Sequence, residues 1–197
     1  MKLIYFGIFL LAIYFVFQSF IPIKALYTEK QKYRKVLVKP DFEIRFYPEA
    51  TFATVYSNAT NYKSLASNGF RKLAGFIFGG NKENESIAMT APVRMSMSEK
   101  GSSMSFVMPE KYDTKNLPTP NNAEITIQKS TPEYVAVISF GGYASDEKIK
   151  EYNDKLIQIL TKENIKIKGP FSFLGYNAPF QFMGRTNEVI IPIEWKE

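Results

Sequence analysis

Residues 42–57, "FEIRFYPEATFATVYS", contain two runs in which apolar and polar residues alternate, separated by Pro48 and Glu49. Alternation with a period of two predicts β-strands with one buried face, and a proline between two such runs favours a turn. Residues 125–140, "ITIQKSTPEYVAVISF", have the same order of strand, Pro-Glu break and strand. The chain therefore contains a degenerate internal repeat, and this repeat decides the expected fold.

A helical pattern follows each strand pair. Ser145 is expected to cap the second helix, because a serine hydroxyl can accept a hydrogen bond from the first turn, where Asp146 and Glu147 favour the helix dipole. Gly79 and Gly80 are expected to end the first helix. The apolar residues at helical spacing are Tyr62, Leu65, Ala66, Phe70, Leu73, Ala74, Ile77 and Phe78 in the first copy, and Ile149, Tyr152, Leu156, Ile159 and Leu160 in the second.

An Ala-Pro step follows each predicted helix. The first is in "SIAMTAPVRMSM" (residues 86–97) and the second in "FLGYNAPFQF" (residues 173–182). Proline cannot donate to a sheet ladder, so each step is expected at a bulge or bend, and bulges are common beside functional sites. Met89 and Tyr176 each lie two residues before such a step. A pseudo-two-fold axis would make them equivalent, so both are expected to face one cleft between the repeats.

Two copies of strand-strand-helix-strand-strand, at about residues 36–110 and 123–195, predict one α+β domain over residues 36–197. Strands with one apolar face must bury that face against a partner. We therefore expect the two pseudo-symmetric repeats to join in a curved antiparallel sheet or distorted barrel, flanked by the two helices. The stretch "GRTNEV" (residues 184–189) is expected to be a tight turn in which Gly184 and Asn187 adopt special backbone angles.

The N-terminal segment is strongly apolar. Residues 3–23, "LIYFGIFLLAIYFVFQSFIPI", would span roughly 30 Å as a helix, the thickness of a bilayer core. We expect residues 1–23 to be a single-pass membrane anchor, with a cleaved signal segment as the alternative, although no small-x-small cleavage site follows. Residues 24–35, "KALYTEKQKYRK", are expected to form a basic juxtamembrane linker, and their lysines favour the cytoplasmic side for the domain.

Histidine and cysteine are both absent from the 197 residues. Their absence excludes disulfides, thiolate metal sites, cysteine nucleophiles and Ser-His-Asp catalysis, and it removes the usual axial ligand of haem iron. We therefore expect a protein that is not an enzyme and has no metal site built from its own side chains. The net charge of +6 is spread along the chain without a nucleic-acid-binding motif, so no nucleic-acid partner is expected.

Six motifs in order resemble the SOUL haem-binding protein family: "PDFEIRFYP", "GFRKLAGFIFGGN", "IAMTAPV", "MSFVMP", "VAVISFGG" and "GRTNEVIIPI". The resemblance covers roughly residues 33–195. It implies a two-repeat α+β barrel, non-covalent binding of haem or a related tetrapyrrole, and no established catalytic activity. The same architecture resembles the effector-binding domains of bacterial multidrug-response regulators. Because some family members are thought to ligate haem through histidine, the resemblance implies for this chain either binding by apolar contact or ligation by Tyr, Met or Lys.

The resemblance also implies where the tetrapyrrole is held. In the family the cleft lies against the first helix and the facing strands, and the matching positions here are Arg71, Lys72, Ala74, Gly75, Phe78, Ile87, Met89 and Tyr176. Arg71 and Lys72 would face the propionates, Gly75 would let the ring approach the helix, and Tyr176 would stack or ligate iron. Core packing is nevertheless the first interpretation of the helix stripe and of the methionines.

These expectations lead to a membrane-tethered haem or tetrapyrrole carrier, buffer or sensor as the first hypothesis for function. An effector-binding module for other amphipathic small molecules is the second, and a protein-interaction module is the third. A buried carboxylate in the cleft would favour cationic ligands, whereas a rim of Arg and Lys would favour the propionates of a tetrapyrrole.

Overall fold

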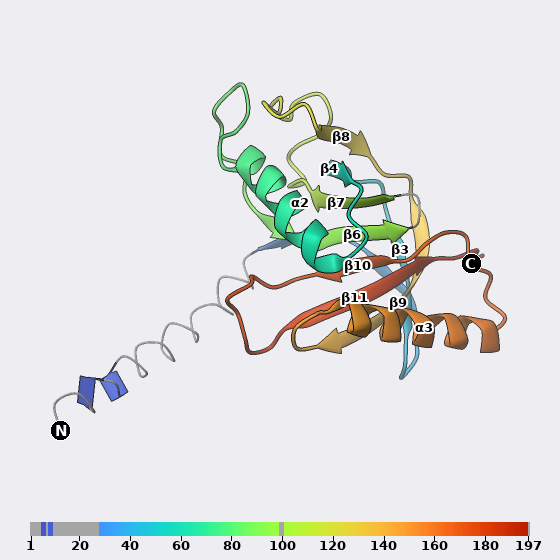
Figure 1. The fold of residues 1–197 in the computed structure, drawn as a ribbon. Coiled ribbons are helices and arrows are strands. Elements are labelled where there is room, and N and C mark those ends of the chain that lie inside the picture. The colour runs from blue at the N-terminus through green and yellow to red at the C-terminus, as the bar shows by residue number, and fades with distance from the viewer. Residues whose placement is uncertain (1–4, 7, 10–27, 99–100, 197) are drawn as a thin grey trace.

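The computed structural model describes residues 5–6, 8–9, 28–98 and 101–196. Two helices, α2 (Tyr62–Ile77) and α3 (Asp146–Lys162), pack against a curled antiparallel sheet (Figure 1). The predicted α+β class, with two helices and a curved sheet, is confirmed. The strands of the sheet are β2 (Arg34–Val38), β3 (Glu43–Tyr47), β4 (Thr51–Ser57), β6 (Val93–Ser98), β7 (Gly101–Val107), β8 (Ile125–Lys129), β9 (Glu133–Gly141), β10 (Ser172–Gly175) and β11 (Thr186–Pro192).

The strand order shows the repeat directly. The nine strands are arranged β2-β3-β9-β11-β10-β6-β7-β4-β8. Apart from β2, each strand of the first copy lies at the position that mirrors its counterpart in the second copy, about the central β6–β10 pair. The sequence repeat at residues 42–57 and 125–140 therefore corresponds to β3–β4 and β8–β9, as the alternation predicts.

Short connections explain why the sheet curls. β3 and β4 are six strand positions apart in the sheet, which is about 29 Å in a flat sheet. The chain from Tyr47 to Thr51 can span at most about 14 Å. The two sides of the sheet must therefore approach one another, and the equally short link between β8 and β9 imposes the same requirement from the other copy.

The predicted start of α3 at Ser145 and the predicted end of α2 before Gly79 are both confirmed. The side chain of Asn61 accepts a hydrogen bond from the backbone of Ser64 at the start of α2, and Ser145 does the same for Lys148 at the start of α3. Gly79, at φ +102°, follows α2 in a conformation that side chains rarely adopt. Asp146 of α3 also accepts from the backbone N–H of Tyr62 at 2.6 Å, so the first turns of the two helices lie side by side.

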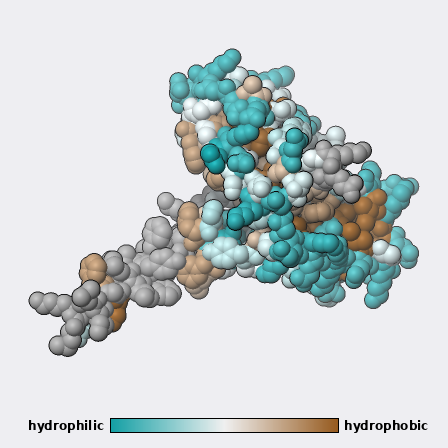
Figure 2. Space-filling model, viewed as in Figure 1, coloured by the Kyte–Doolittle hydropathy of each residue, from teal (hydrophilic) through white to brown (hydrophobic). Residues whose placement is uncertain are grey.

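The two faces of the sheet carry different packing. One face and both helices form the main core, which includes Leu73 of α2 and Leu156 of α3. The opposite face carries a smaller cluster, composed of Tyr47, Val135, Val137, Leu174 and Ile190. We call the face that bears this smaller cluster the inner face. The outer surface of α3 is largely hydrophilic (Figure 2).

The predicted equivalence of the two Ala-Pro steps is wrong. Ala91-Pro92 precedes β6, whereas Ala178-Pro179 follows β10, the counterpart of β6. The step that precedes β10 is instead Gly169-Pro170. Thr90 and Ala91 form the two-residue strand β5 (Thr90–Ala91), which pairs in parallel with β1 (Glu29–Lys30). The first step thus marks where the chain bends to meet its own N-terminal part.

Most of the predicted anchor, residues 1–23, lies outside the described residues. Tyr5, Phe6, Ile8 and Phe9 are helical and exposed. Among the described residues, no helix is both long enough and apolar enough to cross a membrane. From residue 28 onward the chain belongs to the fold, because β1 and the first residues of β2 fall within the stretch expected to be a basic linker.

Candidate functional site

Three of the predicted site residues form a stripe along the outer side of α2. Arg71, Gly75 and Phe78 are spaced i, i+4 and i+7, so they lie on one side of the helix, and each is exposed. The side chain of Phe78 is 68% exposed. A Cβ atom placed on Gly75 would have no atom within 4 Å. The α2 stripe therefore combines an exposed aromatic ring, an open stretch of backbone and a cation.

Lys72 and Ala74 flank this stripe on its two sides. Ala74 is half-buried and lies four residues before Phe78, next to the stripe. The Nζ atom of Lys72 donates a hydrogen bond of 2.8 Å to Glu124, which precedes β8. This hydrogen bond, together with the positive charge of Lys72, holds the pKa of the Glu124 carboxyl below its usual value. Lys72 thus already has a carboxylate partner, whereas Arg71 points into solvent-exposed surroundings.

Ile87 and Met89 follow the end of α2 closely. The backbone N–H of Ile87 donates to the carbonyl of Ile77 at 2.8 Å, and Phe78 forms a bridge with Ser86. Ile87 is fully buried in the main core, and Met89 is partly buried against it. The structure therefore brings Ile87 to the C-terminal end of α2, and Met89 follows two residues later. Ile87 packs as a core residue, and Met89 keeps part of its surface accessible.

Tyr176 lies away from these residues, on the inner face of the sheet. Its ring packs against the smaller cluster, and its hydroxyl donates to the Oε2 atom of Glu188 at 2.7 Å. Met89 packs against the main core instead, so the expectation that Met89 and Tyr176 share one cleft is wrong. The error arises because the two Ala-Pro steps are not equivalent. Tyr176 lies directly after β10, whereas Met89 lies before β6.

The inner face also carries a buried charged network that sequence reasoning missed. Arg45 of β3 makes two hydrogen bonds to the carboxylate of Glu188 on β11, at 3.0 and 2.9 Å. Both residues are about 5% exposed or less. The Nε atom of Arg45 also donates to Glu43 at 2.7 Å, and its guanidinium lies 4.2 Å from the centre of the Tyr33 ring. This geometry is the two-pronged pairing that arginine makes with carboxylates.

Burial and charge together shape the ionisation of this network. Burial alone would lower the pKa of Arg45, but the hydrogen bonds and negative charge of Glu188 outweigh it and raise the pKa. Burial, followed by the charge of Glu188, raises the pKa of Tyr176 far above its usual range. Burial also raises the pKa of Tyr47 to about 12. Both phenols therefore stay protonated, which disfavours a tyrosinate at Tyr176.

One sequence signal could have indicated this network. In "EIR" and in "NEVII" a charged residue alternates with apolar residues. When such a strand is buried on both faces, the charged side chain also lies inside the protein and needs a partner there. The expectation of a tight turn at residues 184–189 left this signal unused. Gly184 does adopt a φ of +61°, but Asn187 is a buried residue of β11 whose side chain donates to the Gly142 carbonyl at 2.8 Å.

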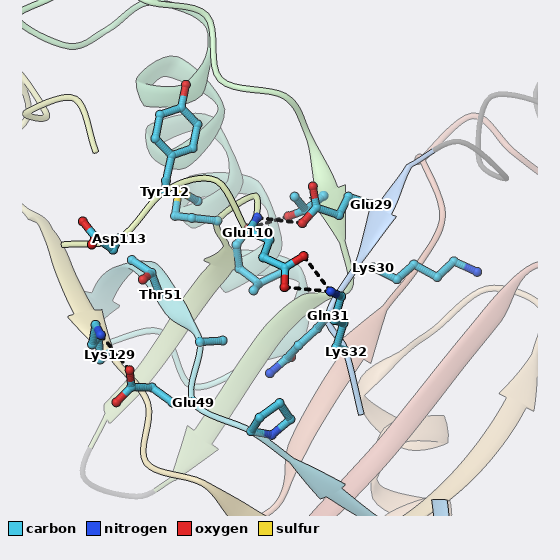
Figure 3. Close-up of a pocket in the computed structure, with 15 residues that line it drawn as sticks. Glu29, Lys30, Gln31, Lys32, Glu49, Thr51, Glu110, Tyr112, Asp113 and Lys129 are labelled. Carbon is cyan, nitrogen blue, oxygen red and sulfur yellow. Dashed lines mark hydrogen bonds and ion pairs between the residues drawn. The ribbon is translucent and has the colours of Figure 1, made fainter. Parts of the chain in front are cut away.

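Residues 28–33, which we call the N-terminal strap, separate two clefts. Gln31 holds the strap in place, because its backbone N–H donates to the Ala91 carbonyl at 2.9 Å. The first cleft, with a volume of about 350 Å³, is lined by charged side chains that pair with one another, such as Lys32 with Glu110 and Lys129 with Glu49 (Figure 3). The second, of about 340 Å³, lies over Tyr176 and Glu188, and we call it the inner cleft.

The curled sheet with two helices on one face defines the class of fold, and comparison with known proteins agrees. The crystal structure of the EcmrR C-terminal domain has a TM-score of 0.57 over 83% of this chain and 99% of that chain, at 11% identity. A hydrolase from Listeria innocua has a TM-score of 0.54 over 89% of this chain and 98% of that chain, at 9% identity. At such low identity, these structures show the fold alone.

Sequence comparison identifies the family. The family model "SOUL heme-binding protein" matches residues 28–192. Heme-binding protein 2 of Mus musculus is 33% identical over 75% of this chain and 76% of its own length, and heme-binding protein 2 of Homo sapiens is 30% identical over the same shares. The chain belongs to the SOUL heme-binding protein family, and the resemblance seen in the six sequence motifs is confirmed.

Proposed function

We propose that this protein binds haem or a related tetrapyrrole, without catalysing a reaction, and that the ring lies against the α2 stripe. Membership of the SOUL family supports the ligand class. The observation that carries the location is the pairing of an exposed Phe78 with an open Gly75 one turn earlier. A flat ring needs a flat surface of this kind, and an aromatic side chain left in water gains free energy when such a ring covers it.

The surrounding charges suit a tetrapyrrole with two carboxylates. Arg71 lies one turn before Gly75, is exposed, and offers a planar fork for a propionate. Lys72 contributes less, because it is already paired with Glu124. Covering one side of a porphyrin by contact supports affinity in the micromolar range, about 8 kcal/mol. Met89, partly buried against the main core two residues after Ile87, would add polarisable surface if the ring extends to it.

The iron of a bound haem would not receive the usual ligand. The chain has no histidine, and Tyr176 lies on the inner face of the sheet with its hydroxyl proton donated to Glu188. The haem chemistry itself belongs to the cofactor, so the residues of the α2 stripe serve to bind and orient it. The absorption spectrum of the complex is therefore expected to differ from that of a haem with two axial histidines.

Hemin titration of a Phe78→Ala variant tests this site. Phe78 is exposed, so its removal should leave folding intact while it weakens hemin binding about tenfold, the loss of roughly 1.4 kcal/mol of apolar contact. Tyr56→Ala is the matched control, since Tyr56 is 60% exposed on β4 and should leave the affinity unchanged. Equal affinity in wild type and Phe78→Ala, or a sharp low-spin spectrum with both axial positions filled, would contradict binding by contact at α2.

We also propose that residues 1–23 hold the domain at a membrane, with the cytoplasmic side favoured. The apolar run of residues 3–23 and the lysines that follow it support this arrangement. A tether would keep the binding domain beside the bilayer, where apolar tetrapyrroles concentrate. The protein would then act as a membrane-bound carrier, buffer or sensor of its ligand.

A cation-binding effector module is the competing function, and the inner face bears on it. Glu188 is a buried carboxylate beside a cleft, which is what a cationic ligand would need. Arg45 already neutralises that carboxylate through two hydrogen bonds, however, and Tyr176 and Ser139 donate to it as well. A cation would have to displace a buried guanidinium, so the network favours the tetrapyrrole proposal over this alternative.

A further inference from the structure

The loop between β10 and β11, residues 176–185, exposes two large apolar side chains. Phe180 is 60% exposed and Met183 is 59% exposed. Figure 2 shows apolar side chains at the outer end of this loop, which projects from the sheet in Figure 1. Tyr143, 54% exposed, lies against its base, because the guanidinium of Arg185 is 4.4 Å from the centre of the Tyr143 ring. We call this loop, together with Tyr143, the apolar loop surface.

Three backbone carbonyls of the loop are paired inside it, whereas the buried Nε atom of Arg185 has no hydrogen-bond partner among the described residues. The Nη1 atom of Arg185 donates to the carbonyls of Ala178 and Gln181, and the side chain of Gln181 donates to the carbonyl of Met183 at 2.9 Å. Gln181 is itself only 4% exposed. A carbonyl that leaves water without a partner costs free energy. Because these carbonyls already have partners, the tip can enter an apolar medium without that cost.

The position of the loop indicates which apolar medium it meets. Asn177, Gln181 and Gly184 line the inner cleft together with Thr28 of the N-terminal strap. Thr28 lies five residues after Ile23, the last residue of the apolar segment, and five residues can span at most about 18 Å. The loop is therefore tied to the point where the expected anchor enters the domain, and Lys30 and Arg185 place positive charge there.

We propose that the apolar loop surface is a second membrane contact, in which Phe180 and Met183 insert into the interfacial layer of the bilayer that holds the N-terminal segment. The proposal rests on the membrane tether proposed above. Aromatic and apolar side chains with adjacent cations are the composition that binds this layer. Contact at this loop would fix the orientation of the domain and place the mouth of the inner cleft at the lipid surface.

Single cysteines make the test direct, since the natural chain has none. Full-length Phe180→Cys and Met183→Cys variants, labelled with an environment-sensitive fluorophore, are reconstituted in vesicles of phosphatidylcholine and phosphatidylserine. Val38→Cys is the matched control, because Val38 is also 60% exposed. The following residue, Lys39, pairs with Glu163 at the far end of α3, about 26 Å along that helix from its start near Tyr143.

Lipids with a spin label near the headgroup end of the acyl chain should quench the fluorophore at positions 180 and 183 at least about twofold more than at position 38. Flotation of the vesicles separates the two proposals. Protein that floats with the vesicles but shows equal quenching at all three positions would leave the tether intact and overturn the loop contact. Protein that fails to float would overturn both. Unchanged melting curves in the three variants confirm that each label sits on a folded domain.

Discussion

Glu188 carries a charge into the interior of the sheet, and its partners explain how that charge is accommodated. Arg45 binds it through two hydrogen bonds, and the Tyr176 hydroxyl and Ser139 complete its surroundings. A buried ion pair of this kind adds little net stability, because desolvation offsets the attraction, but removal of one partner is costly. The network links β3 directly to β11, which lie on either side of β9 in the sheet.

Tyr47 gives this part of the fold a measurable pH dependence. Burial raises its pKa from 10.0 to about 12 in the folded protein, so between these values the unfolded chain loses a proton that the folded protein keeps. The free energy of unfolding should therefore fall as the pH rises from 10 to 12, by about 2–3 kcal/mol from this residue. Tyr47→Phe should remove that part of the loss, measured by urea unfolding at several pH values.

At neutral pH the same variant should change stability by less than about 1 kcal/mol. The buried Tyr47 hydroxyl lies beside the Arg45 guanidinium but forms no hydrogen bond of normal geometry with the described residues, so its removal costs little. Tyr56→Phe is the control, because the Tyr56 side chain is 60% exposed. If Tyr47→Phe loses stability between pH 10 and 12 as steeply as wild type does, another group causes the alkaline unfolding.

At the scale of the element, the outer side of α2 contains a residue type that disfavours helices. Gly75 costs the helix conformational entropy, yet nothing in its surroundings requires a small residue, since a Cβ there would meet open space. Gly69 differs, because a Cβ at that position would lie 3.0 Å from the Cβ of Met104. A glycine with no packing role on the outer side of a helix is explained if a ligand approaches the backbone there.

A Gly75→Ala variant distinguishes the effect of this residue on helix stability from its effect on ligand binding. The variant should raise the free energy of unfolding by about 0.5–1 kcal/mol, as expected for a glycine replaced within a helix. It should also weaken hemin binding about tenfold, because a methyl group holds the ring away and dispersion contacts fall steeply with distance. Gln158→Ala, at an exposed position of α3, controls for a helix change away from the site. A more stable protein with unchanged hemin affinity would place the ring elsewhere.

Local patterns in the sequence predict the elements but not their partners. Alternation and capping residues are local, so β3, β4, β8, β9 and both helices are found from the sequence. The Arg45–Glu188 pair joins residues 143 positions apart, and no local pattern shows such a contact. The same limit explains the error at Tyr176, because the face on which a residue lies depends on which strands flank it. The positions Arg71, Gly75 and Phe78 came from the family resemblance, whereas helical spacing alone grouped Phe78 with the apolar residues of α2 and did not indicate its exposure.

At the scale of the whole molecule, the repeat leaves the two halves with different surroundings. The N-terminal strap crosses the side of the sheet where β5 precedes β6, and it separates the charged cleft from the inner cleft. The second half has no matching strap within residues 101–196, and its β10–β11 loop lies beside the strap instead. The asymmetry therefore follows from the N-terminal extension, which connects the domain to residues 1–23.

The N-terminal segment should make the whole protein an integral membrane protein. Fractionated cells should retain the full-length chain in membranes after a carbonate wash, because residues 3–23 are apolar enough to span a bilayer. Leu11→Arg with Phe15→Arg should release it, since each charge near the centre of a membrane helix costs about 2.5–3.5 kcal/mol. Val38→Arg with Tyr56→Arg adds the same charge at exposed positions outside the apolar loop surface and should not release it. A shortened soluble protein would show a cleaved signal, and full-length protein released by carbonate would show that the segment does not span the bilayer.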